Sequence, residues 1–459
     1  MVSFSTFDLV VICLFALITL LIGFLSTRKS MADNEDYLLA GRKVGLIPFI
    51  LINVSTWYGG ILGVGEFTYR YGLLSWFTQG LPYYIFAILF AVFLVPKIRG
   101  GSIFTIPEKI YKEFGTALSL WSALLVFILV TPAPYLLMIA NIIDLVFNTG
   151  IFVALIIGAV ISIVYLFFGG FRANVWVDSF LFFIMFGGFI LTLFLLVDNY
   201  GGLTFLTNNL PPSHLKLTGD ASPMFIIVWF IIAIWTFTDP GFHQRTSSAS
   251  SIKVAKWGII ISVVFWGGFD FLTTSIGLFS RALLPDLVNP VLSYPLLAEK
   301  VLTDGIKGIF YIAMFATILS TLNSFFFLSA TTISFDFLAK LLKSGNMGKF
   351  NLRIMTSIGL VLSAALSVLL AYFVPSVIQI WYSVGSIFIP SLLIIIMTAY
   401  FQQIRISKLW LFGESLISAL ISLILFLVGF QGEPMLIGLG TVALLHLIGL
   451  IIYRQKKYC

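Results

Sequence analysis

Two apolar segments of this chain are each interrupted by residues that do not suit the middle of a membrane helix. The first reads Asn53-Val54-Ser55-Thr56-Trp57-Tyr58-Gly59-Gly60, and the second reads Trp235-Thr236-Phe237-Thr238-Asp239-Pro240-Gly241. At membrane depth, backbone can leave the helix only where protein or a water-filled cavity satisfies its N–H and C=O groups. A matched pair of interrupted segments in the two halves of a chain therefore points to a binding site between them.

The composition is that of a polytopic membrane protein. Of the 459 residues, 60% are hydrophobic and only 10% are charged, which is unlike a soluble domain. The sequence Thr131-Pro132-Ala133-Pro134 should distort the apolar segment that contains it. Taking roughly 20 apolar residues as enough to cross a bilayer, we predict about 13 helices, at residues 7–27, 44–68, 73–96, 117–146, 149–168, 178–197, 223–243, 255–280, 306–338, 353–374, 377–400, 407–429 and 434–453.

The basic residues are distributed unevenly between the two sides of these spans. Of the 26 Lys and Arg residues, one side carries only Arg70, Lys216, Arg281, Lys300 and Lys307. Since cytoplasmic loops carry the excess of Lys and Arg, we predict an external N-terminus and a cytoplasmic C-terminus in the plasma or inner membrane. Basic residues spread over many short loops give no support for nucleic-acid binding. The two cysteines, Cys13 and Cys459, would lie too far apart for a disulfide.

The two interrupted segments open two sets of five spans, once the first span and the last two are set aside. Because five is odd, the second set runs through the membrane in the opposite direction, which gives inverted repeats. We therefore predict an all-α polytopic membrane protein with a 5+5 inverted-repeat core and extra helices at both ends. A single membrane domain would cover 1–459, with a first repeat in 44–243 that extends to the second interrupted segment, a second repeat in 223–400, and peripheral helices in 407–459.

One helix face carries a row of hydroxyl groups. Thr317, Ser320, Thr321 and Ser324 follow the i, i+3, i+4, i+7 spacing of a helix. Hydroxyl oxygens suit a hard cation, and carbonyls freed by a break after Leu51 would complete its shell. Ser and Thr also line helix–helix contacts in membranes, so the spacing alone leaves both interpretations open.

Five short motifs, in this order and spacing, resemble those of the sodium:solute symporter family, whose inverted-repeat fold is LeuT-like. The likeness to the family extends over nearly the whole length of the chain. They are Asp36-Tyr37-Leu38-Leu39-Ala40-Gly41-Arg42, Thr105-Ile106-Pro107-Glu108, Gly169-Gly170-Phe171-Arg172-Ala173-Asn174-Val175-Trp176-Val177-Asp178, Gln244-Arg245 with Ala255 or Lys256 further on, and Ser320-Thr321-Leu322-Asn323-Ser324 with Asp336 downstream.

The resemblance implies a set of Na⁺ ligands. They are the backbone carbonyls of Leu51 and Val54 and the side chains of Thr317, Ser320 and Thr321.

The resemblance also places Asp178, with Ser324, on the exit path of that ion or at a second Na⁺. Pairing of Asp178 with Arg172 is an equal alternative.

The chain departs from the family in ways that bear on the solute. Val177 and Leu181 stand where the family has Thr and Gln, which removes a hydroxyl beside Asp178. Ile232 and Trp266 replace polar groups that galactose carriers use, so a hexose is disfavoured. Half-helix N-termini at the two interruptions favour amino acids or organic acids, because their N–H groups attract a carboxylate.

The solute pocket should be lined by the two interrupted segments and the helices that face them. Asp239 either binds a cationic solute or a proton, or caps the helix that follows it. Asp270, within another span, has either a structural or a coupling role. The aromatic candidates also suit ordinary packing or the membrane interface. The candidates are Asn53, Ser55, Trp57, Tyr58, Tyr135, Trp235, Thr238, Asp239, Trp381 and Tyr382.

The resemblance implies secondary active transport: Na⁺-coupled symport of a small amino acid, carboxylate or vitamin-like solute by alternating access. We expect a monomer in contact with membrane lipid. A solute sensor without net transport and a proton-coupled or uncoupled carrier of the same fold remain alternatives. An enzyme would need clustered His, Cys or carboxylates at one depth, and His214, His243 and His446 are far apart in the sequence.

Overall fold

The computed structural model describes residues 2–27, 34–101, 105–164, 166–338, 340, 352–430 and 433–458, and the regular structure in these ranges is helical. Cys13 is free and exposed, whereas Cys459 lies outside the described residues. The main helices are α1 (Thr6–Thr27), α2 (Asn34–Leu39), α3 (Leu46–Ser55), α4 (Ile61–Tyr71), α5 (Leu81–Phe93), α6 (Val95–Arg99), α7 (Ile106–Phe114), α8 (Thr116–Leu129), α9 (Ala133–Phe147), α10 (Ile151–Val164), α11 (Leu166–Tyr200), α12 (Leu203–Asn209), α13 (Pro223–Ile232), α14 (Trp235–Thr238), α15 (Pro240–Ser248), α16 (Ile252–Leu283), α17 (Ser293–Val301), α18 (Ile306–Thr331), α20 (Leu352–Phe373), α21 (Val377–Tyr400), α22 (Lys408–Leu427) and α23 (Pro434–Tyr458).

Short irregular helices join or extend several of these elements. They are η1 (Ala40–Arg42), η2 (Thr56–Gly60), η3 (Trp76–Gly80), η4 (Pro212–Leu215), η5 (Pro290–Leu292), η6 (Thr332–Leu338) and η8 (Gln402–Ile404).

The prediction of a polytopic helical membrane protein is confirmed. Within the described residues, 11 helices are long and apolar enough to cross a membrane, and the bent pair Pro223–Thr238 and Pro240–Ser248 makes a twelfth span. The predicted span 149–168 corresponds to α10, which has only 14 residues. The segment 117–146 is divided, because α8 ends at Leu129 and α9 begins at Ala133. This division follows the prolines of Thr131–Pro134, which cannot continue a regular helix.

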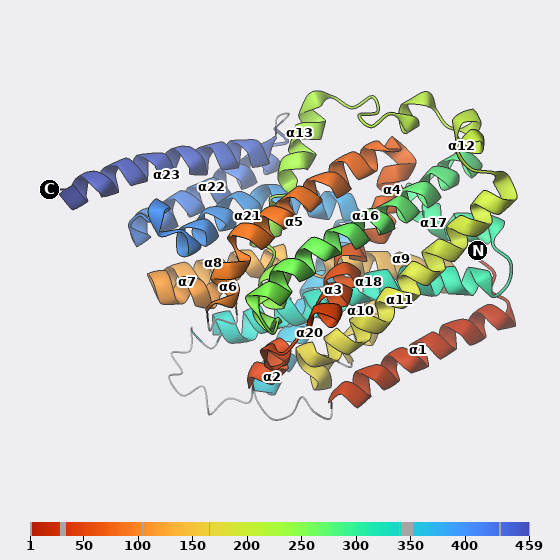
Figure 1. Ribbon diagram of the computed structural model, residues 1–459, viewed down its shortest axis with the longest axis horizontal. Helices are drawn as coiled ribbons and strands as arrows, with labels where there is room; N and C mark the ends of the chain where they lie inside the picture. Colours follow the sequence, from red (N-terminus) through yellow and green to blue (C-terminus); the bar gives the residue numbers. More distant parts are fainter. Residues whose placement is uncertain are drawn as a thin grey trace.

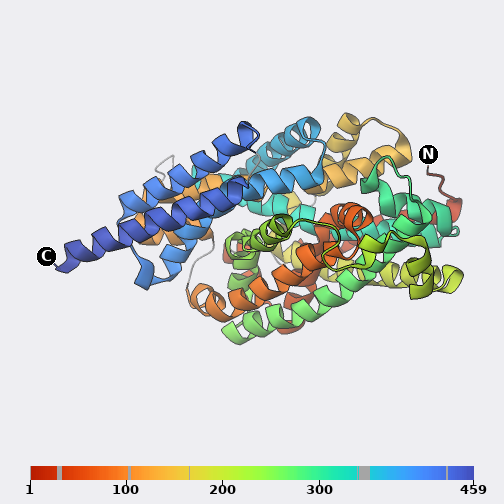
Figure 2. The same cartoon turned by 90° about the horizontal axis from the view of Figure 1, so that it is seen from above.

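The long helices lie side by side, with the two interrupted segments inside the bundle (Figure 1). The segment η2 packs on α18, and α14 packs between α5 and α21. The peripheral helices α22 and α23 pack on α21 and lie together at one side of the bundle (Figure 2). The N-terminus lies near α12 and α17, and the C-terminus lies at the opposite end (Figure 1). The interrupted segments are therefore enclosed by protein on several sides.

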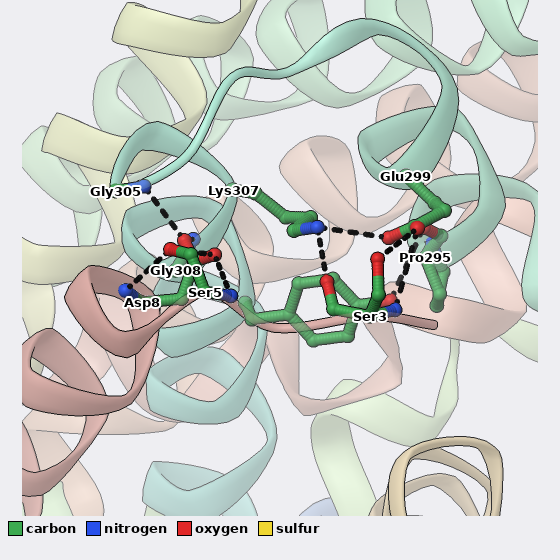
Figure 3. Close-up of polar contacts among 9 residues, drawn as sticks. Ser3, Ser5, Asp8, Pro295, Glu299, Gly305, Lys307 and Gly308 are labelled. Carbon is green, nitrogen blue, oxygen red and sulfur yellow. Dashed lines mark hydrogen bonds and ion pairs between the residues drawn. The ribbon is translucent and has the colours of Figure 1, made fainter. Parts of the chain in front are cut away.

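The first turn of α18 is capped by a carboxylate from another helix. Asp8 of α1 accepts hydrogen bonds from the backbone N–H groups of Gly305, at 2.8 Å, and Gly308, at 2.7 Å (Figure 3). The N–H groups at the start of a helix have no partner within that helix, so this carboxylate supplies acceptors that α18 lacks. A Cβ at Gly308 would approach Asp8 within 2.9 Å, so the glycine permits the contact.

A second polar cluster ties the N-terminal segment to α17. Lys307 forms an ion pair with Glu299 at 3.1 Å and also donates to the backbone carbonyl of Ser3 (Figure 3). Burial acts to raise the pKa of the Glu299 carboxyl, but its bonds with Lys307 and Ser3 outweigh that effect and lower the pKa. The α17–α18 loop is therefore fixed to the start of the chain at this end of the bundle.

Candidate ion and solute site

The first interrupted segment changes helix type without leaving the span. The α-helix α3 continues through Ser55, and the tighter 3-10 turn η2 follows, before α4 resumes at Ile61. We expected a break after Leu51, and this was wrong by four residues. The Thr56 N–H reaches both Ile52 O and Val54 O, so the backbone stays hydrogen-bonded through the transition.

Two glycines let this segment lie directly on its neighbours. A Cβ added to Gly59 would overlap the side chain of Thr321 on α18, and one added to Gly60 would overlap the indole of Trp381 on α21. Because glycine has no Cβ, η2 can approach both helices more closely than any other sequence would permit. The close approach brings backbone oxygens of the first segment to the hydroxyl face of α18.

Buried hydroxyl groups join the first segment to α18. Thr321 Oγ1 donates to the carbonyl of Thr56 at 2.6 Å, and the hydroxyls of Ser320 and Ser55 lie 3.2 Å apart. Thr317, the third predicted side-chain ligand, donates within its own helix to Met314 O at 2.6 Å. All of these hydroxyl-bearing residues are buried.

The residues whose carbonyls were predicted as ligands precede these contacts in the chain. Val54 directly precedes the Ser55 and Thr56 positions that touch α18, and its side chain is fully buried. Leu51 lies one turn earlier on α3 and is only partly buried. The structure thus brings neutral oxygens of the first segment and of α18 into contact. Ser55 and Thr56, more than Leu51, make the direct contacts with the hydroxyl face.

A buried acid and a buried base lie beside this cluster. Asp178 of α11 is 2% exposed; its Oδ2 lies 3.4 Å from Thr56 Oγ1, and its Oδ1 has no hydrogen-bond partner in the structure. Arg245 of α15 donates from Nε to Asn53 Oδ1 at 3.0 Å, which ties the two interrupted segments together. Arg245 acts electrostatically on both Asp178 and Asp239. Ser324 is buried on the same helix as Ser320.

The second interrupted segment is broken more sharply than the first. The axes of Pro223–Thr238 and Pro240–Ser248 differ by 41°. Asp239 is extended, as expected for a residue before proline, and its carboxylate accepts the N–H of Phe242 at 2.9 Å. Of the two roles considered for Asp239, the geometry thus shows the helix cap.

A cavity of about 140 Å³ lies between the two interrupted segments and the helices that face them. Six of the predicted pocket residues line it: Trp57, Tyr58, Tyr135, Trp235, Asp239 and Trp381.

The other four predicted pocket residues lie elsewhere. Asn53 is held by Arg245 and Ser55 faces Ser320, as described above, while Thr238 donates back to Trp235 O at 3.0 Å. Tyr382 donates to Glu433 at 2.6 Å and lines a second cavity of about 450 Å³. Trp229 lines both cavities and so separates the inner cavity from the second one.

Part of the cavity wall was not predicted from the sequence. Trp76 and Gln79 of the π-helical turn η3 line the cavity, as does Tyr83 of α5. Gly80 and Pro82 inside the predicted span 73–96 were the available signal for this irregularity. Asp270, which we expected to be structural or coupled to transport, also lines the cavity and accepts a hydrogen bond from Tyr84.

Comparisons with known proteins agree with this geometry. Residues 37–407 match the sodium:solute symporter family. The chain is 26% identical over 384 residues to a sodium/glucose cotransporter of Vibrio parahaemolyticus, covering 72% of this chain and 68% of that protein. It is 25% identical over 381 residues to the sodium/pantothenate symporter of Escherichia coli, covering 77% and 76%.

Solved structures share the fold. A Na⁺-coupled sialic acid symporter in a substrate-bound outward-open state superposes with a TM-score of 0.79 at 18% identity, covering 97% of this chain and 98% of that one. Mhp1, a nucleobase-cation-symport-1 family transporter, superposes with a TM-score of 0.59 at 14% identity, covering 93% and 97%. The LeuT-like fold is therefore confirmed. The family match covers most of the chain, so this protein belongs to the sodium:solute symporter family and is a multi-pass membrane transporter that couples Na⁺ to a small solute.

Proposed function

We propose that this protein carries a small organic solute into the cell with Na⁺, and that the ion binds where the first interrupted segment meets α18. The observation that carries the proposal is the contact of Ser320 and Thr321 with Ser55 and Thr56. Buried neutral oxygens of this kind suit Na⁺, a hard cation that must also leave readily. The ligand set we propose is Leu51, Val54, Thr317, Ser320 and Thr321.

The position of Asp178 beside the proposed ion site suggests where the ion leaves it. Among the described residues its Oδ1 is buried without a hydrogen-bond partner, and a passing cation would supply that interaction. Asp178 and Ser324 are accordingly proposed as an exit path or a second ion position.

The solute is proposed to occupy the aromatic cavity between the two interrupted segments. One water needs roughly 10–15 Å³ of such a cavity, so this one holds a solute on the order of ten non-hydrogen atoms. Bound Na⁺ would hold the first segment against α18 and favour the outward-open state, and rocking of the repeats would then open the cavity to the cytoplasm. The coupling is reciprocal: Na⁺ tightens solute binding by the factor by which solute tightens Na⁺ binding.

We also propose the repeat boundaries 44–243 and 223–400 and an external N-terminus in the plasma or inner membrane. The N-terminus, α12 and α17 share one end of the bundle, which agrees with the side that carries few basic residues (Figure 1). The protein is further proposed to act as a lipid-embedded monomer, without an enzymatic step and without nucleic acid.

The function is tested with purified protein in proteoliposomes. An inward Na⁺ gradient should drive accumulation of a radiolabelled solute above its external concentration, and a K⁺ gradient of equal size should not. Solute binding without accumulation would instead indicate a sensor, and accumulation driven by a pH gradient alone would indicate proton coupling.

A further inference from the structure

The wall of the solute cavity is unusually rich in aromatic rings. Trp57, Trp76, Tyr83, Trp229, Trp235 and Trp381 are among its lining residues. Several of these rings are held by other rings: Trp57 lies 4.9 Å from Tyr83 and 5.1 Å from Trp266, measured between ring centroids. A rigid aromatic wall offers electron-rich faces, which attract a cation, along with a large apolar contact area.

The charged groups in the wall are unequal in number. The cavity is lined by two acids, Asp239 and Asp270, and by one base, Arg245. Arg245 already has partners. It donates a hydrogen bond to Asn53 and interacts electrostatically with both Asp239 and Asp178.

Asp270 is therefore the acid that no base balances. It is 8% exposed and accepts a hydrogen bond from the hydroxyl of Tyr84. In the part of the chain that the structure describes, Asp270 forms no ion pair with Lys, Arg or His. A buried carboxylate that faces a cavity without a basic partner must be neutralised, either by a proton or by a cation that enters the cavity.

Neither helix start at the two interruptions presents free N–H groups that would attract an anion. Asp239 itself occupies the N-terminus of α15 through its bond with the Phe242 N–H. The start of α4 follows directly from the hydrogen-bonded turn η2, so it does not present a free helix N-terminus to the cavity. These two helix starts therefore give no preference for an anionic solute over a cationic one.

We propose that the transported solute carries a positively charged nitrogen, as an amine or a quaternary ammonium group, which Asp270 and the aromatic wall bind together. This inference rests on the proposed function, since it names the solute class of that same cavity. The charged nitrogen would lie near Asp270 and Tyr84, and the rings would pack on its alkyl groups. A carboxylate elsewhere on the same solute is compatible with the proposal.

A pair of isosteric probes tests the charge directly on the unmodified protein. Choline and 3,3-dimethylbutan-1-ol have the same shape, but only choline carries a positive charge. In a panel with betaine, proline, glucose and pantothenate, thermal stabilisation in the presence of Na⁺ should be found for the probes with a charged nitrogen. Choline should bind at least tenfold more tightly than 3,3-dimethylbutan-1-ol. Equal affinity of the pair, binding only of glucose or pantothenate, or no response to any charged nitrogen would overturn the proposal.

Substitution locates the cation. Asp270→Asn should lower the affinity for the best charged probe at least tenfold and leave stabilisation by Na⁺ alone unchanged. Asp144→Asn, the same change on α9 outside the cavity wall, should leave both unchanged. Unchanged affinity in Asp270→Asn would contradict the assignment. If Asp270→Asn does not fold, the choline pair still decides the question on the wild-type protein.

The two proposals fail in different ways. Na⁺-driven uptake of a solute that has no charged nitrogen, such as glucose, would reject the charged nitrogen and retain symport. Uptake of a charged-nitrogen solute that ignores the Na⁺ gradient would retain the solute class and reject Na⁺ coupling.

Discussion

The two interrupted segments occupy corresponding places in the two halves of the chain, yet they are built differently. The first tightens into a 3-10 turn at Thr56–Gly60 and continues in the same span. The second bends by 41° at Asp239-Pro240. The first is fastened to another helix, through Thr321 and Ser320 of α18, whereas the second is stabilised within its own segment by the cap of Asp239 on Phe242.

This difference suggests separate roles for the two segments, one in Na⁺ coupling and the other in shaping the cavity. A turn whose oxygens already contact a neighbouring helix can be held or released by an ion that binds between them. A segment whose helix start is filled by its own carboxylate does not need an ion to complete it. Coupling to Na⁺ should therefore depend on the first segment, and the second should chiefly shape the cavity.

The largest effect should come from adding a side chain where the first segment meets α18. Gly59→Val would force the Thr321 side chain away, at a cost of about 1–3 kcal/mol for such overpacking. We expect Na⁺-dependent uptake in proteoliposomes to fall below detection. Gly267→Ala is the control, because a Cβ there meets no atom within 4 Å. Normal Na⁺-dependent uptake by Gly59→Val would show that the close approach is not required.

Removing the hydroxyl groups of α18 should have the next largest effect. In the double variant Ser320→Ala and Thr321→Ala, two oxygens are lost, each worth about 1 kcal/mol, so the Na⁺ concentration for half-maximal uptake should rise on the order of tenfold or more. Thr331→Ala is a matched control, since that hydroxyl bonds to Phe327 O of its own helix. If the Na⁺ affinity is unchanged, Ser320 and Thr321 do not bind the ion and serve only in helix packing.

Substitutions of Asp239 test whether its carboxylate stabilises the second segment as a helix cap or through its negative charge. Asp239→Ala should lower the free energy of unfolding by about 0.5–2 kcal/mol, because the Phe242 N–H loses its acceptor. Asp239→Asn keeps an acceptor oxygen and should unfold at nearly the wild-type temperature. Thermal unfolding in detergent measures both. If the Asn variant is as unstable as the Ala variant, the negative charge opposite Arg245, rather than the cap, stabilises the segment.

The smallest effect on transport should come from the cap that α1 provides to α18. Asp8→Ala should cost about 0.5–2 kcal/mol of stability, since the N–H groups of Gly305 and Gly308 lose their acceptor. The Na⁺ affinity should stay within about twofold, because this cap lies at the end of the helix and not at the hydroxyl face. A tenfold loss of Na⁺ affinity with normal stability would show that α1 sets the position of the ion site.

Much of the architecture could be predicted from local sequence alone. Long apolar segments must be helical at membrane depth, so the span positions follow from composition. The second break is equally local, because Pro240 pushes the residue before it out of the helical region. The first break was predicted too early, after Leu51. No residue between Leu51 and Val54 interrupts a helix, and α3 continues through Ser55. The transition comes at Thr56, next to the Ser55 and Thr56 contacts with α18.

The cavity could be predicted only in part, since a side chain's direction depends on the packing of its helix. Trp381 and Tyr382 are neighbours on α21, but they point about 100° apart, and so they line different cavities. The irregular turn η3, which brings Trp76 into the wall, had only Gly80 and Pro82 as local signals.

The sequence by itself thus determined that this chain forms membrane helices with two interruptions and a row of hydroxyl groups, because these are properties of short segments. Only the tertiary structure decided which oxygens meet and which cavity acid forms no ion pair with a base among the described residues. Thr56 and Thr321, like Tyr84 and Asp270, are far apart in the chain and come together through helix packing. Their contacts depend on how closely whole helices approach, and that distance is set by glycines and rings on other elements.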